Sequence, residues 1–290
     1  MMDKSGTSPG LILAPLRGVT IRCFRETFAR EIREAGFTEA ITPFIAANQG
    51  VDPLKDRELR NHAIDASIPL TPQFIGKDPS ALKDSLIRIK EAGFTTADLN
   101  CGCPFPMVRN KGRGSGILRT PDILARMLAA GCETLGERCF SVKTRLGVEK
   151  NDELLALMPV FNAFPLRFIT VHARNARQMY EGECDAKAFL AVREASANPV
   201  VYNGDAPLSS KDRPLMVGRA FVRCLGERDD ARELLKRYAA ASLEELHAER
   251  PVIGRMKELL AYWKDMPRWR ARWTIAKTAR SLQEFLLAIS

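Results

Sequence analysis

Eight short apolar segments are spread through the first 217 residues, and helical patterns separate several of them. A buried parallel strand is typically a continuous apolar run of this length, and the connection between parallel neighbours is usually a helix. Such an alternation is typical of an α/β fold with eight strands, the (β/α)8 TIM barrel, which we predict here. The predicted strands cover residues 11–14, 40–46, 70–75, 97–100, 139–144, 167–171, 199–203 and 215–217.

Local signals between these segments agree with a barrel. Asp78-Pro79 and Thr120-Pro121 each place an N-cap residue before a proline that fits the first helical position. The sequence Glu-Ala-Gly-Phe-Thr occurs at 34–38 and again at 91–95, each time between a helical stretch and a strand. The first copy closes a helix that we predict over residues 21–35, because glycine commonly follows the last helical residue. Two copies are consistent with repeated βα units.

From residue 221 the strand pattern stops and helical patterns follow. Met256, Leu259, Leu260 and Trp263 have the spacing of one helix face, which we interpret as the core of a helix bundle. The predicted domains are a barrel over residues 1–220 and an all-helical domain over 221–290. Residues 206–214 leave no room for a two-turn helix with its loops, so the seventh βα unit is predicted to be shortened.

A cysteine stands between glycine and proline directly after the predicted fourth strand. Segment 98–104 reads Asp-Leu-Asn-Cys-Gly-Cys-Pro, so Gly102 allows unusual backbone angles and Pro104 restricts the residue before it. A thiol held in this way points toward the face where barrels carry their chemistry. The alternative is that Cys101 and Cys103 are small buried hydrophobes, the common role of free cysteines. A zinc site is not indicated, because no second ligand pair follows.

Polar side chains and glycines also follow the other predicted strands. Because the carboxyl ends of the strands meet at one face of a barrel, we expect these residues to form one site. Arg219 with nearby backbone N–H groups suits a phosphate, Lys143 can neutralise an electron-rich ring, and His172 can contact a cofactor. The alternatives are a surface lysine in an ion pair and a structural histidine. No GxGxxG follows the first strand, so a Rossmann site is not indicated. The site residues are Pro15, Leu16, Gln73, Asn100, Lys143, Arg145, His172, Arg174, Asn203, Gly204, Asp205, Gly218 and Arg219.

Basic residues outnumber acidic ones by 44 to 35, which fits either a solvated surface or a polyanionic partner. Residues 250–280 contain nine basic and two acidic residues, with Trp263, Trp269 and Trp273 interleaved. A basic helical face with aromatic residues suits a nucleic-acid backbone, although a solvated face fits this segment equally well. The candidate RNA contacts in this segment are Arg268, Arg270 and Arg272.

Seven scattered cysteines do not form the pattern of a disulfide framework, which predicts a reducing compartment. The N-terminus lacks the apolar core of a signal peptide, and no run reaches the length of a membrane span. We therefore expect a soluble, cytoplasmic protein that does not bind membranes, and a monomer.

Several of these segments together resemble the signature of tRNA-dihydrouridine synthases. The most specific is segment 98–104, followed by glycines at positions 112, 114 and 116. The others, in family order, are 14–20, 143–147, 171–174 with Tyr180-x-Gly182, and 203–205. The Cys-Gly-Cys spelling and the stretch 255–262 look closest to the bacterial C-type subgroup, which is similar in acting on a D-loop uridine at position 16.

The resemblance implies an FMN-bound barrel, a helical tRNA-binding domain, and reduction of a uridine C5–C6 bond in tRNA with NADPH as reductant. Cys103 would be the general acid that protonates C5 while the reduced flavin gives hydride to C6. Asn100 would orient the uracil, and Arg145 and Arg174 are implied as substrate contacts, with flavin as the alternative for Arg174. The implied FMN contacts are Pro15, Leu16, Gln73, Lys143 and His172 at the ring, and Asn203, Gly204, Asp205, Gly218 and Arg219 at the phosphate.

The chain departs from the family pattern at two places near the expected phosphate site. The segment 206–214 is short, and Gly218-Arg219-Ala220 stands where the family has Gly-Arg-Gly. One alternative is therefore a tRNA-binding homologue that has lost flavin chemistry. Another is an FMN reductase of free pyrimidines, which leaves the basic C-terminal segment without a role.

Overall fold

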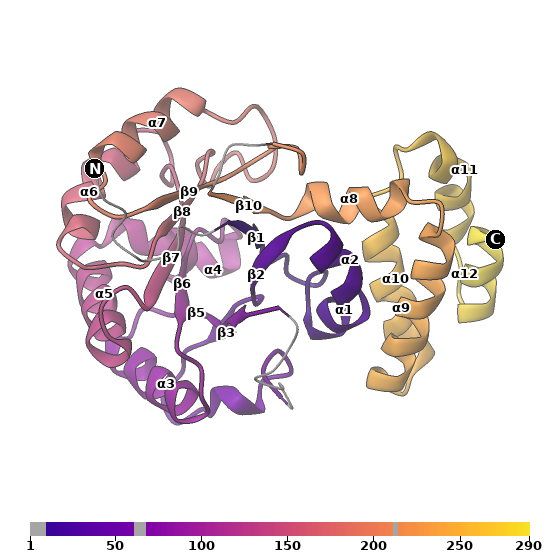
Figure 1. Cartoon of the computed structure of the whole chain (residues 1–290), viewed down its shortest axis with the longest axis horizontal. Coiled ribbons are helices and arrows are strands. Elements are labelled where there is room, and N and C mark those ends of the chain that lie inside the picture. Colours follow the sequence, from indigo (N-terminus) through magenta and orange to yellow (C-terminus); the bar gives the residue numbers. More distant parts are fainter. Residues whose placement is uncertain (1–9, 61–67, 211–213) are drawn as a thin grey trace.

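The structure is a computed structural model that describes residues 10–60, 68–210 and 214–290. Parallel strands form its centre, with helices around them and a group of further helices to one side (Figure 1). No helix of the described part is long and apolar enough to cross a membrane.

Two of the eight predicted strands are each divided in two by a proline. The strand expected at 40–46 becomes β2 (Phe37–Ile41) and β3 (Ile45–Ala46) around Pro43, and that at 70–75 becomes β4 (Leu70–Thr71) and β5 (Gln73–Ile75) around Pro72. Proline has no N–H to donate to a ladder, which interrupts the pairing. The pieces still pair as two continuous strands would, β2 with β4 and β3 with β5.

The remaining pairings close the ring. The other strands are β1 (Leu11–Leu13), β6 (Ala97–Cys101), β7 (Phe140–Arg145), β8 (Ile169–His172), β9 (Val200–Asn203) and β10 (Leu215–Val217). Each pairs in parallel with its neighbours along the chain from β5 to β10, and β10 pairs with β1, which pairs with β2. With the divided strands counted as one each, this is an eight-stranded barrel, and the predicted fold class is confirmed.

Helices follow most of the strands. Asp78 precedes α3 (Pro79–Glu91) and accepts hydrogen bonds from the N–H groups of Ser80 and Ala81. The Thr120 hydroxyl before α5 (Pro121–Leu135) instead donates to the carbonyl of Ile117. The single helix expected over 21–35 is interrupted at Phe28. The helices are α1 (Arg22–Thr27), α2 (Ala29–Glu34), α3 (Pro79–Glu91), α4 (Pro106–Arg109), α5 (Pro121–Leu135), α6 (Glu153–Asn162) and α7 (Ala186–Ala195), with 3-10 turns at Pro53–Lys55 and Gly114–Arg119.

The seventh βα unit is shortened, as expected. Within residues 204–210 and 214, which connect β9 to β10, the structure has bends and turns and no helix. The second unit is also reduced in the part described, because only the 3-10 turn Pro53–Lys55 lies between β3 and β4.

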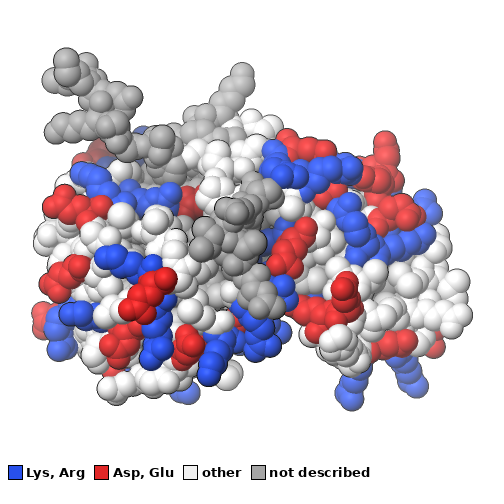
Figure 2. Space-filling model, turned by 60° about the horizontal axis from the view of Figure 1, so that its bottom comes forward, with Lys and Arg blue, Asp and Glu red and all other residues white. Residues whose placement is uncertain are grey.

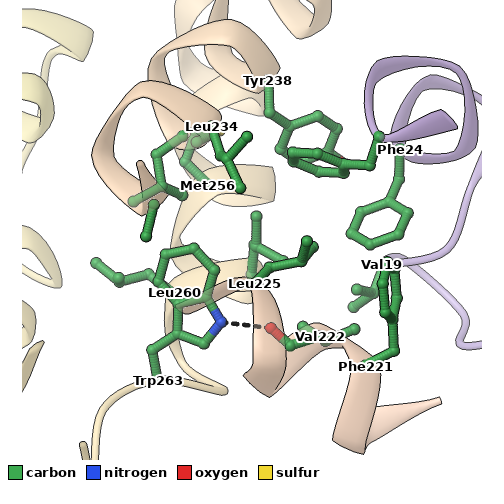
Figure 3. Packing of buried hydrophobic residues seen from close by; sticks show 14 of the residues in the cluster. Val19, Phe24, Phe221, Val222, Leu225, Leu234, Tyr238, Met256, Leu260 and Trp263 are labelled. Atoms are coloured by element: carbon green, nitrogen blue, oxygen red, sulfur yellow. Dashed lines mark hydrogen bonds between the residues drawn. The ribbon is translucent and has the colours of Figure 1, made fainter. Parts of the chain in front are cut away.

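Five helices follow β10 and share one continuous apolar core with the barrel (Figure 3). The ring of Tyr238 lies 5.9 Å from that of Phe24 and 5.3 Å from that of Phe28, both on the barrel side. Trp263 is fully buried and donates from Nε1 to the carbonyl of Val222 at 2.6 Å. The helices are α8 (Arg219–Glu227), α9 (Ala231–Leu246), α10 (Glu249–Leu260), α11 (Pro267–Ala276) and α12 (Leu282–Ile289). A domain boundary at residue 220 stays a prediction, and the shared core runs across it.

The face shown in Figure 2 carries basic and acidic side chains interspersed over both the barrel and the added helices. On this face the net positive charge of the chain does not form one continuous basic surface.

Candidate active site

One cavity at the carboxyl ends of the strands brings most of the predicted site residues together. Its lining includes eleven of them, which come from β1, β6, β7, β8, β9, β10 or the loops that follow these strands. Among the described residues, no Asp or Glu lines this cavity, so its charged groups are all basic. The eleven are Pro15, Leu16, Asn100, Cys103, Lys143, Arg145, His172, Asn203, Gly204, Gly218 and Arg219.

The loop after β6 holds Cys103 at this cavity by hydrogen bonds on both sides. Asn100 Oδ1 accepts from the backbone N–H of Cys103 at 2.9 Å and of Gly102 at 3.2 Å. The Cys103 carbonyl accepts from the backbone N–H and the hydroxyl of Ser115, at 3.1 and 2.9 Å. Gly114 has a positive φ of 57°, and a Cβ there would lie 2.7 Å from Cys103 Cβ. The glycine motif of the sequence therefore allows two backbone segments to meet at the thiol.

Asn100 and Gln73 support the loop from below. Asn100 Nδ2 donates to Gln73 Oε1 at 2.8 Å, and Gln73 Nε2 donates to Asp98 Oδ2 at 2.7 Å. Gln73 is fully buried and lies outside the cavity lining. Burial raises the pKa of Asp98 to about 6, against the effect of the hydrogen bonds from Ser141 and Gln73. The contacts of Gln73 with flavin and of Asn100 with uracil stay predictions. In this structure both amides form the hydrogen bonds that hold the loop of Cys103.

The two neighbouring cysteines have different surroundings. Cys101 is completely buried within an apolar cluster of the barrel, which is the role of a small hydrophobe, and burial raises its pKa well above the ordinary value. Cys103 faces the cavity. Burial also raises the pKa of its thiol, while a hydrogen bond from the Phe105 N–H and the charges of Arg17, Arg145 and Lys143 act in the opposite direction. A thiol with a raised pKa keeps its proton at neutral pH and can donate it.

Two basic residues of β7 face the same cavity. Burial lowers the pKa of Lys143 to about 8, assisted by the charge of Arg145, and in the described part of the chain its side chain forms no hydrogen bond or ion pair. Arg145 donates to the carbonyls of Gly102 and Asn175, each at 2.9 Å, and burial lowers its pKa to about 10. A desolvated cation without a counter-ion favours a ligand that brings negative charge.

His172 ends the neighbouring strand β8, in register with Arg145, and Arg174 follows two residues later. Arg174 Nη1 lies 3.2 Å from His172 Nε2, and because arginine only donates, Nε2 is the acceptor and the proton is on Nδ1. Burial and the charges of Arg145 and Lys143 strongly lower the pKa of His172, so the ring is neutral. Arg174 itself is buried outside the lining and pairs with Asp205, which also accepts from Arg219 at 2.6 Å. Asp205 therefore bridges two arginines beside the expected phosphate position.

Tyr180 is a lining residue to which the sequence reasoning gave no role. Its ring lies 5.4 Å from the Arg145 guanidinium, 5.3 Å from that of Arg219 and 6.2 Å from the His172 ring. The two arginine distances are those of cation–π contacts on an exposed aromatic side chain. The only signal in the sequence was the Tyr-x-Gly motif, which marks a turn but not the direction of the tyrosine.

No residue of the basic C-terminal segment 250–280 lines this cavity. Arg268 donates to the carbonyls of Glu227 and Arg228, Arg272 to those of Arg268 and Ser290, and Arg270 to that of Asp265 at 3.5 Å. Their role in RNA binding stays a prediction. Of the three interleaved tryptophans, Trp263 and Trp269 are buried at 0% and 1% exposure in the apolar core, which confirms the core role predicted for Trp263 and leaves neither ring as an RNA surface.

Comparison with protein families places residues 12–213 in one described family, dihydrouridine synthase (Dus). A tRNA-dihydrouridine synthase B from Vibrio cholerae serotype O1 is 30% identical over 220 residues, which are 72% of this chain and 66% of that protein. A tRNA-dihydrouridine synthase B from Escherichia coli is 29% identical over 263 residues, 82% of this chain and 80% of that protein. The match thus spans slightly less than two thirds of the Vibrio protein. These relatives carry the B-type name, so they lend no support to the expected C-type subgroup.

A likeness of fold extends to enzymes with little sequence in common. The old yellow enzyme homologue from Zymomonas mobilis has a TM-score of 0.54 at 11% identity, over 74% of this chain and 85% of that one. At this identity the likeness concerns the barrel alone.

Proposed function

Because this chain belongs to the dihydrouridine synthase family, we propose that it is an FMN-dependent tRNA-dihydrouridine synthase, an oxidoreductase that reduces the C5–C6 bond of a uridine in tRNA. The observation that carries the proposal is the thiol of Cys103 at a basic cavity that it shares with Lys143 and His172. We further propose NADPH as the reductant and a D-loop uridine as the target.

The residues of the cavity fit a flavin. Lys143 is a half-buried cation with no partner in the described part, which suits the negative charge of a reduced ring, and His172 keeps an Nδ1–H that can donate. Arg219 lies near the glycines 204 and 218, where a phosphate would need both charge and backbone N–H groups. Pro15 and Leu16 supply apolar contact from the first loop. Bound there, FMN supplies a hydride for C6 of the uracil.

The protein's own part in the reaction is to deliver and replace a proton. Cys103 holds its proton at neutral pH and gives it to C5, the carbon next to the C6 that receives hydride. The thiolate that remains is stabilised by the Phe105 N–H and by the charges of Arg17, Arg145 and Lys143 until water restores the proton. Asn100 keeps the thiol direction constant through the turnover, because it binds the backbone of Cys103 and not the sulfur.

The direct test is a spectrum followed by an assay. We expect the purified protein to absorb in the visible range as a flavoprotein, or to do so after addition of FMN. We then expect dihydrouridine in tRNA that lacked it, after incubation with NADPH, as measured by mass spectrometry of nucleosides. A protein that neither carries nor binds flavin contradicts the proposal.

A second candidate is a tRNA-binding homologue without flavin chemistry. The described connection between β9 and β10 has no helix, and Asp205 already pairs with Arg219, the cation that a phosphate would require. This candidate predicts salt-dependent tRNA binding by a colourless protein that forms no dihydrouridine. The same spectrum therefore separates the two candidates.

A further inference from the structure

A second, larger hollow opens directly from the candidate active site. It has a volume of about 1060 Å³, and it shares six lining residues with the inner cavity, so the two form one continuous space. We call it the outer groove: the loop 105–113 borders it, and Glu258 of α10 and Tyr262 after that helix reach into it. The shared residues are Leu16, Arg17, Phe44, Phe105, Tyr180 and Arg219.

Exposed apolar side chains gather at the loop side of the outer groove. Met107 is 83% exposed and Phe105 is 40% exposed, and both belong to or adjoin the short helix α4. Pro106, between them, fixes the start of that helix and the backbone at that point. Large apolar groups held toward water at the entrance of a site indicate a surface that becomes covered by a ligand.

The charges around these groups are predominantly positive. Arg17, Lys111, Arg113 and Arg219 line the outer groove, whereas Glu258 is its only acidic residue in the described part. Within that part the side chain of Lys111 forms no hydrogen bond or ion pair, and the one side-chain partner of Arg113 is Asn48 Oδ1 at 3.5 Å. Unpaired cations beside exposed aromatic and apolar groups suit a single-stranded nucleic acid, whose phosphates and bases meet both kinds of group.

We propose that the outer groove binds the unpaired nucleotides next to the uridine that is reduced. Phe105 and Met107 provide a platform for a neighbouring base, and Lys111 and Arg113 face the phosphates. This inference rests on the proposed function, since it takes the inner cavity as the site of the uridine. It adds that the recognised ligand is an unstacked RNA segment of several nucleotides, bound beside loop 105–113 independently of the arginines on α11.

The test measures binding of short RNA and requires no turnover. Fluorescein-labelled uridine pentanucleotide and uridine mononucleotide are titrated against the full-length protein by fluorescence anisotropy. We expect the pentamer to bind more tightly than the monomer, and Met107→Ala and Phe105→Ala each to weaken pentamer binding about tenfold. The double variant Lys111→Ala/Arg113→Ala should lower the slope of log affinity against log salt by about 1.4, at roughly 0.7 per phosphate contact.

Matched controls come from exposed residues outside the groove. Leu287→Ala removes an apolar side chain that is 69% exposed on α12, and Lys236→Ala removes an exposed cation on α9, and both should bind the pentamer as the unchanged protein does. A groove variant that fails to fold is recognised by its circular dichroism, and Met107→Ala then remains decisive, because that side chain is almost fully exposed.

The outcomes separate this inference from the proposed function. Equal affinity for pentamer and monomer, or pentamer binding that is unchanged in Met107→Ala and the double variant, overturns the groove even if the protein forms dihydrouridine. Groove-dependent pentamer binding by a protein that takes up no flavin supports the groove and contradicts the proposed reaction.

Discussion

Asn100 and Cys103 are joined by a hydrogen bond of 2.9 Å from the cysteine backbone N–H to the amide oxygen of the asparagine side chain. The other end of the same amide donates to Gln73, which in turn donates to Asp98. The direction of the thiol thus depends on a row of buried side chains beneath it. Buried amides in such a row are costly to leave without partners.

Replacing Asn100 tests this row. In Asn100→Ala the N–H groups of Gly102 and Cys103 and the Gln73 oxygen lose their partner, so we expect the free energy of unfolding to fall by about 1–3 kcal/mol. Turnover should fall as well, because the thiol loses its fixed direction. Urea denaturation and a dihydrouridine assay measure the two effects. A variant as stable as the unchanged protein would show that the amide does not hold the loop.

The two cysteines give a matched pair for the chemistry. We expect Cys103→Ala to keep flavin and tRNA binding and to lose about 10²–10⁴-fold in turnover, the usual contribution of a general acid. Cys101→Ala, which removes a sulfur from an apolar cluster, should lower stability and leave most of the turnover. Single-turnover formation of dihydrouridine compares them. Equal losses of turnover would mean that the general acid is wrongly assigned.

The charged form of Lys143 should lower the free energy of unfolding of the flavin-free protein. Its folded pKa of about 8 lies below its ordinary 10.5, so between these pH values the unfolded chain binds more protons and stability rises with pH. Below about pH 8 the penalty is fully present. We therefore expect Lys143→Met to raise the free energy of unfolding at pH 7 by about 1 kcal/mol in flavin-free protein.

The pH dependence supplies the check. The difference in urea midpoint between Lys143→Met and the unchanged protein should shrink as the pH rises from 8 toward 10.5. The same variant should bind flavin more weakly, because the cation for the reduced ring is gone. A difference in midpoint that stays constant across this range would rule out the titration of Lys143 as its origin.

The arginines of α11 are tested together. If they bind RNA, replacing Arg268, Arg270 and Arg272 by alanine weakens tRNA binding and lowers its salt slope, by about 1 for each phosphate that an arginine neutralises. The thermal midpoint should also fall, since Arg268 and Arg272 donate to backbone carbonyls at the ends of α8 and α12. Titrations at several salt concentrations measure the slope. A lower thermal midpoint with unchanged binding would remove α11 from the RNA footprint.

The predicted boundary at residue 220 is open to a truncation experiment. A fragment of residues 1–220 would expose Phe24 and Phe28, which are fully buried against Tyr238 in the whole chain. We expect this fragment to lack a cooperative urea transition and near-ultraviolet circular dichroism. The full chain is the control. A sharp transition in the fragment would establish the barrel as an independent domain.

The strands and their common rim could be predicted from the sequence because each depends on a local pattern. An apolar run ended by polar residues indicates both a strand and the end at which its functional residues lie. This pattern predicts that Lys143 and His172 share one site, as they do. The breaks at Pro43 and Pro72 could also be predicted from the sequence, since proline has no N–H and interrupts a ladder wherever one is needed.

The sequence leaves a choice open where one pattern has two meanings. Trp263 belongs both to an apolar helix stripe and to a row of aromatics between basic residues, and only packing against Val222 and α8 decides for the core. Gln73 begins β5, and its amide is hydrogen-bonded to Asn100 and Asp98, a direction that the sequence does not reveal; its contact with flavin stays a prediction. Side-chain direction at a strand end depends on neighbours that are distant in the sequence.

Gly114 limits how this chain can vary. A methyl group at that position would press on the β-carbon of Cys103 itself, whereas one at Gly136 would meet nothing within 4 Å. In a library of random variants, the first position should therefore accept glycine alone among active clones, while the second should tolerate residues that can adopt its positive φ. Such a contrast in mutational tolerance would locate the reactive thiol of Cys103 without mutating or labelling the cysteine itself.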